Sequence, residues 1–390
     1  MGVSFAYLSA GRMCLKRDGE PVVTVDSHYA RQARERAVQI QQRNAWKTAG
    51  TGARFMSGGA VWGRGGPSEA VLRTQITGLT RGPGSGEVYY ALETSDVSGV
   101  FLLRDAGAQE DRLFHTTDYH VAELSLRDDH EMLACVVGYR DGSSNIGIMQ
   151  SDGSGLTEVT QGDAIDRAPH WVPGCKNQLV FQSAGIGRTA QGLAMGQSPF
   201  AIHKVDTERG EVTCLAEDPD HDLLAPQLLA DGTLYYIRRP YRGATPKLSP
   251  GRALLDFVLF PFRLFHALFQ YLNFFSVSYT GKPLTTAGGQ RQKMADVRQM
   301  MIWGNLIQAD KSTQSAEEEV SALVPDSWQL VRRSPNGQTT TLAKSVVSFD
   351  LCKDGTLICS NGNAVLHIDQ DGTSQCLHKD KLIEHVVACE

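Results

Sequence analysis

The fold is decided by residues 120–160, which read HVAELSLRDDHEMLACVVGYRDGSSNIGIMQSDGSGLTEVT. Three apolar stretches of strand length are separated by short polar turns, and a fourth, shorter stretch containing two Thr residues closes the segment. Two of the turns contain Asp141-Gly142 and Asp152-Gly153, pairs that favour tight hairpins because Gly adopts positive φ without strain. The segment therefore predicts a four-stranded antiparallel meander.

The same block recurs along the chain at a period of about 40 to 50 residues. Further copies begin at Ala168-Pro169 and at Ala225-Pro226, and the last one spans residues 346–377. A single meander cannot bury both of its faces and needs neighbours of the same kind. Repetition at this period is typical of the blades of a β-propeller, so we predict an all-β protein with this architecture.

The repeats resemble the TolB-like propeller repeats, also called PD40 or WD40-like repeats. The resemblance is carried by the sequence APHWVPG at residues 168–174 and by DGSG at residues 152–155, and it extends over residues 87–240 and 345–377. Two departures are visible, because Pro173-Gly174 lacks an intervening Asp and Asp128-Asp129 replaces a Pro-Asp-Gly sequence. The resemblance implies a β-propeller fold.

We predict six blades, or seven if residues 290–344 contain a further one. Residues 1–26 contain three strand-like stretches and residues 384–390 contain one, so we expect the two ends of the chain to form one shared closing blade. Such a closure leaves no strand edge open. Residues 70–240 would form blades two to four and the first part of the fifth, and residues 326–383 would complete the fifth and form the sixth.

Two segments do not fit the repeat. Residues 27–48 contain no Gly or Pro and begin with a Ser, a favourable N-cap residue, which predicts a short helix on the rim of the propeller. Residues 241–325 interrupt the fifth blade as an insertion, and their central part, residues 251–279, is almost entirely apolar. We predict that this part is helical, with a break or kink at Pro261.

The insertion predicts an interaction with a membrane or with a protein. Residues 240–300 contain eight basic and two acidic residues, a net charge of +6, so the rest of this chain of net charge −5 carries −11. An apolar helix with basic neighbours attracts anionic lipid, although the same surface is also typical of an oligomerisation or partner-binding arm. The strands before and after the insertion belong to the same propeller and so lie on the same side of a membrane. This favours a helix that lies in the membrane interface, or re-enters from the same side, over a helix that crosses the membrane once. The expected contact residues are Arg252, Leu255, Phe257, Phe260, Phe262, Arg263, Phe265, Phe269, Phe274 and Phe275.

The sequence contains none of the catalytic, phosphate-binding, zinc or calcium motifs GxSxG, GxxxxGK(S/T), HExxH and EF-hand loop. We therefore predict no catalytic residue, no cofactor and no metal. One polar cluster is expected at an axial funnel beside the innermost strands, and comprises His120, Asp166, Arg167, His170 and Asp222. Propeller lyases that resemble this fold hold a metal with funnel histidines, which leaves as an alternative a lyase or hydrolase acting on a saccharide or small molecule. The other interpretation is structural: the same five residues would occur at strand ends if their side chains only formed hydrogen bonds with buried backbone groups.

The composition narrows the class of protein. A hydrophobic fraction of 41% and a net charge of −5 exclude a disordered tail and a basic nucleic-acid-binding protein. Eight cysteines without a CxxC pair, and the lack of a secretory signal, favour a cytoplasmic location. We predict a non-enzymatic scaffold that binds protein partners through its propeller loops and docks peripherally on an anionic membrane surface through the insertion. The alternative within this class is a soluble scaffold that oligomerises through the insertion.

Overall fold

The computed structural model describes residues 3–25, 27–32, 35–36, 39, 74–94, 97–104, 109–241, 299–302, 305–308 and 321–389, with the backbone alone at 299–302 and 305–308. The chain divides into two compact units. The first unit comprises Met1–Tyr241, Met300–Ile307 and Thr313–Glu390, and the second comprises Arg242–Gln299 and Gln308–Ser312. The fold described below is that of the first unit.

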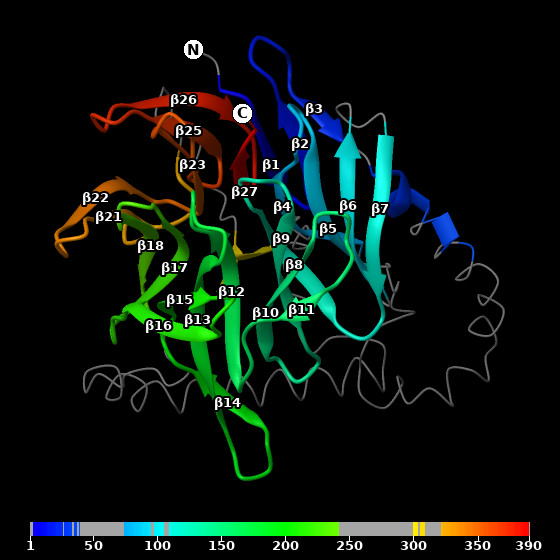
Figure 1. Cartoon of the computed structure of the whole chain (residues 1–390). Coiled ribbons are helices and arrows are strands. Elements are labelled where there is room, and N and C mark those ends of the chain that lie inside the picture. The colour runs from blue at the N-terminus through cyan, green and yellow to red at the C-terminus, as the bar shows by residue number, and fades with distance from the viewer. Residues whose placement is uncertain are drawn as a thin grey trace, which may run out of the picture. The chain divides into compact units, whose positions relative to one another are not determined.

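The first unit is an all-β structure of four-stranded antiparallel sheets (Figure 1). One sheet joins the two ends of the chain in the order β27-β1-β2-β3, with bounds Ile383–Ala388, Phe5–Ser9, Arg12–Lys16 and Val23–Val25. In this sheet Tyr7 of β1 pairs with Val386 of β27 and with Cys14 of β2. The strands β1 and β27 are therefore neighbours although they lie at opposite ends of the sequence.

Three further meanders follow along the chain. The first contains β4 (Gln75–Arg81), β5 (Val88–Glu93), β6 (Ser98–Arg104) and β7 (Gln109–Thr116). The second contains β8 (His120–Leu126), β9 (Met132–Gly138), β10 (Ser144–Gln150) and β11 (Thr157–Glu158). The third contains β12 (Ala164–Trp171), β13 (Gln178–Arg188), β15 (Ala201–Asp206) and β16 (Glu211–Ala216). The second and third are joined by a single parallel pair, Ser144 with Ile165.

Two more meanders complete the set of four-stranded sheets in the described part of the chain. One contains β17 (His221–Leu228), β18 (Leu234–Pro240), β21 (Gln329–Arg333) and β22 (Thr339–Lys344), and the other contains β23 (Ser348–Leu351), β24 (Leu357–Ser360), β25 (Ala364–Ile368) and β26 (Ser374–Lys379). The strands β18 and β21 pair directly, so the long segment between them is an insertion within one sheet. The short strands β19 (Gln299–Ile302) and β20 (Asn305–Gln308) pair with each other and with no other described strand.

The first strand of each meander, together with β27, forms a closed cycle of contacts. Within the described residues, β27 contacts β4, and the contacts continue through β8, β12, β17 and β23 back to β27. We call these six strands the inner strands. The hydrophobic core lies between neighbouring sheets, as where Val100 and Leu102 of β6 pack with Leu133 and Cys135 of β9. Full burial of one such large apolar side chain is worth about 1.5–3 kcal/mol, so contacts between sheets supply much of the stability.

Three inner strands carry a β-bulge at the same place. The pairing register of β8, β12 and β17 shifts around Glu123, Ala168 and Ala225, respectively. These three residues have φ of 45°, 50° and 49°, in the left-handed region that non-Gly residues rarely adopt. A bulge changes which side chains face each side of the strand, and so determines which residues face the space between the inner strands.

A helical stretch begins after β3, with described helical residues at 28–32, 35–36 and 39. The Ser27 Oγ accepts a hydrogen bond from Ala30 N at 3.0 Å, which caps this helix. The Glu110 side chain of β7 accepts hydrogen bonds from the Ser27 Oγ at 2.8 Å and from His28 N at 2.7 Å. A carboxylate at a helix N-terminus is stabilised by the helix dipole. Residues 40–48 of the predicted rim helix lie outside the described residues.

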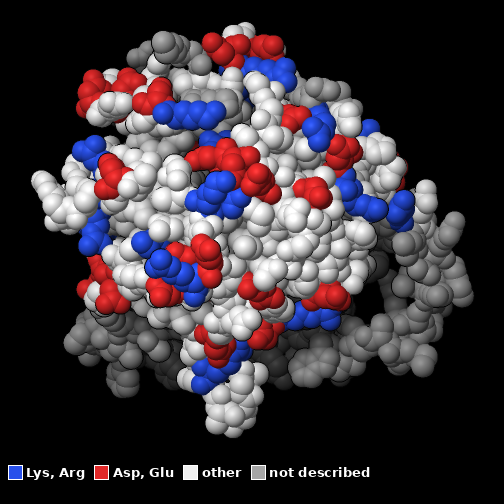
Figure 2. Space-filling model, viewed as in Figure 1, with Lys and Arg blue, Asp and Glu red and all other residues white. Residues whose placement is uncertain are grey.

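The β13 strand extends beyond its sheet and forms a hairpin with β14 (Ala194–Gln197). The turn and β14, residues 189–197, contain no charged residue, and Leu193 and Met195 are 69% and 70% exposed. On the face in Figure 2, the basic and acidic side chains elsewhere are interspersed with each other. The tip of the hairpin, residues 189–197, is therefore uncharged, on a face where charges of both signs are otherwise mixed.

Candidate functional site

The first unit contains a cavity of about 530 Å³ that is lined by segments of all six inner strands. The segments come from the C-terminal parts of β4, β8, β12 and β17, from β23 and from residues 385–387 of β27. A volume of this size lies within the range that accommodates small ligands or a few side chains. The cavity is the candidate functional site.

Five inner strands place a polar residue in the cavity at the same register position. The last paired residues of β4, β8, β12, β17 and β23 are Arg81, Leu126, Trp171, Leu228 and Leu351. The residue immediately before each of them lines the cavity, and we call this set the penultimate layer: Thr80, Ser125, His170, Gln227 and Asp350. Hairpin turns hold this register, and in the β23–β24 turn Gly355 adopts a φ of 82° while Asp354 accepts a hydrogen bond from Thr356 N at 2.9 Å.

The penultimate layer links neighbouring inner strands by hydrogen bonds. The Gln227 Nε2 donates to Asp350 Oδ1 at 3.0 Å, and Ala388 N donates to Asp350 Oδ2 at 2.9 Å. The Ser125 Oγ accepts a hydrogen bond from Trp171 N at 3.3 Å. These side chains therefore have a structural role as well as a place at the cavity wall.

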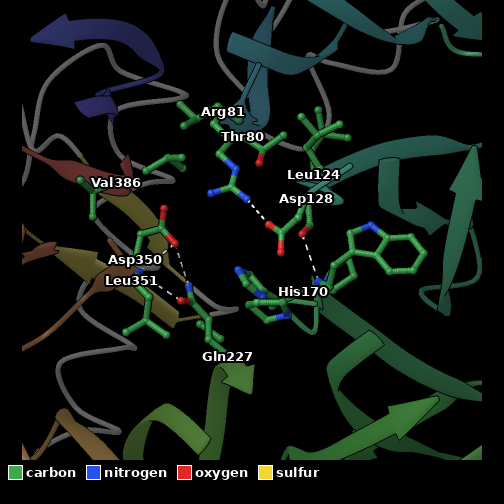
Figure 3. A pocket seen from close by; sticks show the side chains of 18 of the residues that line it. Thr80, Arg81, Leu124, Asp128, His170, Gln227, Asp350, Leu351 and Val386 are labelled. Carbon is green, nitrogen blue, oxygen red and sulfur yellow. Dashed lines mark hydrogen bonds and ion pairs between the residues drawn. The ribbon is translucent and has the colours of Figure 1, made fainter. Parts of the chain in front are cut away.

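Two ion pairs also lie at the cavity. Arg81 Nη2 is 2.5 Å from Asp128 Oδ1, and the Asp128 Oδ2 accepts a hydrogen bond from Gly174 N at 3.3 Å. Glu123, at the bulge of β8, pairs with Arg167 and accepts a hydrogen bond from Ala168 N at 2.7 Å. Figure 3 shows Arg81, Asp128, His170, Gln227 and Asp350 gathered around one space.

Two histidines at the cavity have an unusual environment. The Nδ1 atoms of His170 and His385 are buried and have no hydrogen-bond partner among the described residues. Burial lowers the pKa of His170, whereas the neighbouring Asp350 carboxylate raises it. Burial also lowers the pKa of His385, against the opposite effect of the Asp350 and Glu123 carboxylates. Both imidazoles are therefore predominantly neutral at pH 7.

Of the five funnel residues predicted from the sequence, only His170 lines the cavity. His120 Nδ1 lies 3.0 Å from Glu93 Oε1, and Arg167 pairs with Glu123. Asp222 forms a buried ion pair with Arg239 at 2.9 Å and accepts a hydrogen bond from Phe200 N at 3.0 Å. Asp166 is buried, which raises its pKa, and its Oδ1 has no hydrogen-bond partner among the described residues. Four of the five predicted residues therefore do not line the cavity.

The register of the inner strands explains this difference. An alignment on Ala122, Ala168 and Ala225 makes His120 equivalent to Asp166, but the bulges align Glu123 with Ala168 and Ala225. The predicted residues 120, 166 and 222 precede the bulge, whereas the residues that line the cavity begin at the bulge. Sequence reasoning missed the other members of the site: Thr80, Arg81, Glu123, Ser125, Asp128, Gln227, Asp350 and His385. The sequence did contain one signal for these positions, because the residue that directly follows Ala-Pro in two repeats, His170 or Gln227, lines the cavity in both.

Other predicted sites lie elsewhere or outside the described residues. No group of three or more His, Cys, Asp or Glu side chains in the described part of the chain is arranged to bind a metal ion. The expected contact residues of the insertion, from Arg252 to Phe275, lie outside the described residues. Where the structure describes the chain, no helix combines the length and apolar character needed to span a membrane.

The four-stranded sheets and the cycle of inner strands define a β-propeller fold, and known structures agree with this class. The chain is similar to TolB from Acinetobacter baumannii, with 11% sequence identity and a TM-score of 0.50 over 99% of this chain and 66% of that one. It thus spans just under two thirds of the TolB chain. It is also similar to a chain of the nidogen/laminin complex, with 9% identity and a TM-score of 0.50 over 100% of this chain and 99% of that one. No protein-family model and no curated protein matches the sequence. At these identities the similarity concerns the fold alone.

Proposed function

We propose that the protein is a non-enzymatic, six-bladed β-propeller scaffold that binds a segment of a protein partner in its cavity. The observation that carries the proposal is the penultimate layer, because five strands place polar side chains around one space of about 530 Å³. Propeller loops and channel ends are common sites of partner binding, and a concave site with a few convergent polar groups is the usual form of a binding pocket. The cycle of six inner strands supports the blade count.

We further propose that residues 251–279 dock the scaffold peripherally on an anionic membrane in the cytoplasm. Support comes from the sequence, in which seven Phe residues lie between Phe257 and Phe275 and basic residues dominate on both sides. Such a segment gains binding energy from buried apolar area and from attraction to anionic lipid. Oligomerisation through the same segment is the competing proposal, since exposed apolar surfaces also associate with each other.

Peptide display against the full-length protein tests the cavity. Selected peptides should lose roughly tenfold or more in affinity when Ser85→Trp narrows the opening, because Ser85 is an exposed loop residue that lines the cavity. The matched control is Ser154→Trp, at an exposed hairpin turn that does not line the cavity. If all selected peptides bind both variants equally, the cavity is not the partner site.

Liposome flotation tests the membrane part of the proposal. The intact protein should float with phosphatidylserine liposomes and remain in solution with phosphatidylcholine liposomes, and deletion of residues 253–278 should abolish flotation. Light scattering on the same two proteins tests oligomerisation. An intact protein that stays soluble with anionic liposomes but loses its oligomeric state on deletion would replace the membrane proposal by the oligomerisation proposal.

A further inference from the structure

Two residues of the penultimate layer are more exposed than the other three. Thr80, Ser125 and Gln227 are buried at 8%, 5% and 6% exposure, whereas His170 and Asp350 are only partly buried. A ligand in the cavity would therefore meet an imidazole and a carboxylate. These two groups, with His385, determine which ligand chemistry the inner part of the cavity favours.

Within the part of the chain that the structure describes, Asp350 has hydrogen bonds but no counter-ion. Its donors are the Gln227 amide and the backbone nitrogens of Leu351 and Ala388, all of which are neutral. Among the described residues, no Lys or Arg forms an ion pair with Asp350. The other two carboxylates of the cavity are both paired, Asp128 with Arg81 and Glu123 with Arg167. A partly buried carboxylate without a cation gains most from a ligand that supplies one.

The remaining polar groups agree with a cationic ligand. The charged residues that line the cavity are Arg81, Lys353, Glu123, Asp128 and Asp350, and Arg167, which does not line it, pairs with Glu123. The lowered pKa values of His170 and His385 keep both imidazoles neutral, so neither repels a cation. A neutral imidazole offers one lone-pair acceptor, which can receive a hydrogen bond from an ammonium or guanidinium group.

We propose that the cavity binds a cationic group, the side chain of a Lys or Arg in the partner segment, with Asp350 as its counter-ion and His170 and His385 as hydrogen-bond acceptors. This inference rests on the proposed binding of a partner segment in the cavity. An anionic ligand would face the unpaired Asp350 carboxylate, while Arg81 is already neutralised by Asp128. The ion pair formed with the ligand would be partly desolvated, which strengthens it relative to an exposed pair.

Fluorescence anisotropy with labelled peptides on the full-length protein tests the inference. The probes share a Gly-Ser frame and carry one central Lys, Arg, acetylated Lys or Glu. The Lys or Arg probe should bind, and its affinity should fall roughly tenfold or more on acetylation or in the Asp350→Asn variant. The His170→Gln variant should lose less affinity for the Lys or Arg probe than the Asp350→Asn variant does. The control variant is Asp118→Asn, which removes an exposed carboxylate that does not line the cavity and should leave the affinity unchanged.

The outcomes separate this inference from the proposed function. The proposal of a cationic ligand is overturned if the Glu probe binds more tightly than the Lys and Arg probes. It is also overturned if the Asp350→Asn and Asp118→Asn variants bind the cationic probes with equal affinity. Absence of saturable binding of both cationic probes at millimolar concentration overturns it as well. If display-selected peptides still bind in a manner sensitive to Ser85→Trp in any of these cases, the cavity remains the partner site and only the assigned ligand chemistry is wrong. Circular dichroism of Asp350→Asn confirms that the variant is folded before its affinity is interpreted.

Discussion

Gln227 and Asp350 lie 123 residues apart in the sequence and join the inner strands β17 and β23, with a distance of 3.0 Å from the amide Nε2 to the carboxylate Oδ1. The same amide accepts a hydrogen bond from Leu351 N at 3.1 Å, and the same carboxylate accepts one from Ala388 N on β27 at 2.9 Å. One amide and one carboxylate thus connect three inner strands. The connection also fixes the position of the carboxylate that we propose binds a cation.

Replacing Gln227 by Met should weaken this connection while keeping the side-chain volume. Asp350 loses a donor and Leu351 N loses one of its two acceptors, which should lower the free energy of unfolding by about 1–2 kcal/mol. Urea unfolding followed by tryptophan fluorescence measures the change. The control is Gln191→Met at the exposed turn of the β13–β14 hairpin, which should stay within about 0.5 kcal/mol of the wild type. Equal stability of the two variants would contradict the structural role of Gln227.

The fold could be predicted from the sequence because its determinants are local. Alternating apolar residues and Asp-Gly turns, as at residues 120–160, specify hairpins within one meander, and the structure confirms an all-β protein of four-stranded antiparallel sheets. Repetition then requires that the meanders pack on one another, since each leaves an apolar face uncovered. Both inferences depend on residues that are close together in the sequence.

The site could not be predicted in the same way because it depends on register between repeats. An error of one residue in aligning Ala122 with Ala168 exchanges the side chains that face the cavity, and the bulge at Glu123 carries no Ala-Pro sequence to mark it. Asp350 occupies the penultimate position without a preceding bulge in the pairing of β23. Only the three-dimensional pairing shows that this residue and His170 are equivalent.

Gly78 of β4 is required by its close approach to β8. A Cβ atom at this position would lie 2.4 Å from Glu123 N and 2.8 Å from Glu123 Cα, both of which are backbone atoms. Gly78→Ala should therefore force two inner strands apart and lower the free energy of unfolding by about 1–3 kcal/mol. Gly138→Ala is the control, because its Cβ would be 3.7 Å from the nearest atom, an ordinary contact. If thermal unfolding shows the same midpoint for both variants, β4 and β8 are not in the close contact described here.

Asp222 tests whether a predicted site residue has a structural role. Its ion pair with Arg239 is buried, with side-chain exposures of 4% for both residues. Asp222→Asn removes the carboxylate that contacts Arg239 at 2.9 Å, and should lower the free energy of unfolding by about 3–5 kcal/mol. Asp111→Asn, which breaks a half-exposed pair with Arg104, should cost about 0–1 kcal/mol. A stable Asp222→Asn variant that loses ligand binding would instead assign this residue to a binding site.

Glu384 of β27 should make stability depend on pH. Burial raises the pKa of its carboxyl group to about 7 from an ordinary value of 4.5, while a hydrogen bond from the Gly11 backbone acts in the opposite direction. A raised folded-state pKa means that the contribution to stability is fully present below pH 4.5 and is lost as the pH rises through 7. Because of this group, the free energy of unfolding should therefore fall by about 2–3 kcal/mol as the pH rises from 5 to 8.

Glu384→Gln removes this titration and keeps the shape of the side chain. The stability of the variant relative to the wild type should rise by about 2–3 kcal/mol from pH 5 to pH 8, as measured by urea unfolding at each pH. His170 and His385 act in the other direction, because their lowered pKa values reduce stability as the pH falls below the ordinary value of 6.5. Their effect is common to both proteins and cancels in the difference. A difference that does not change with pH would show that the Glu384 carboxyl group is already ionised at pH 5 in the folded protein.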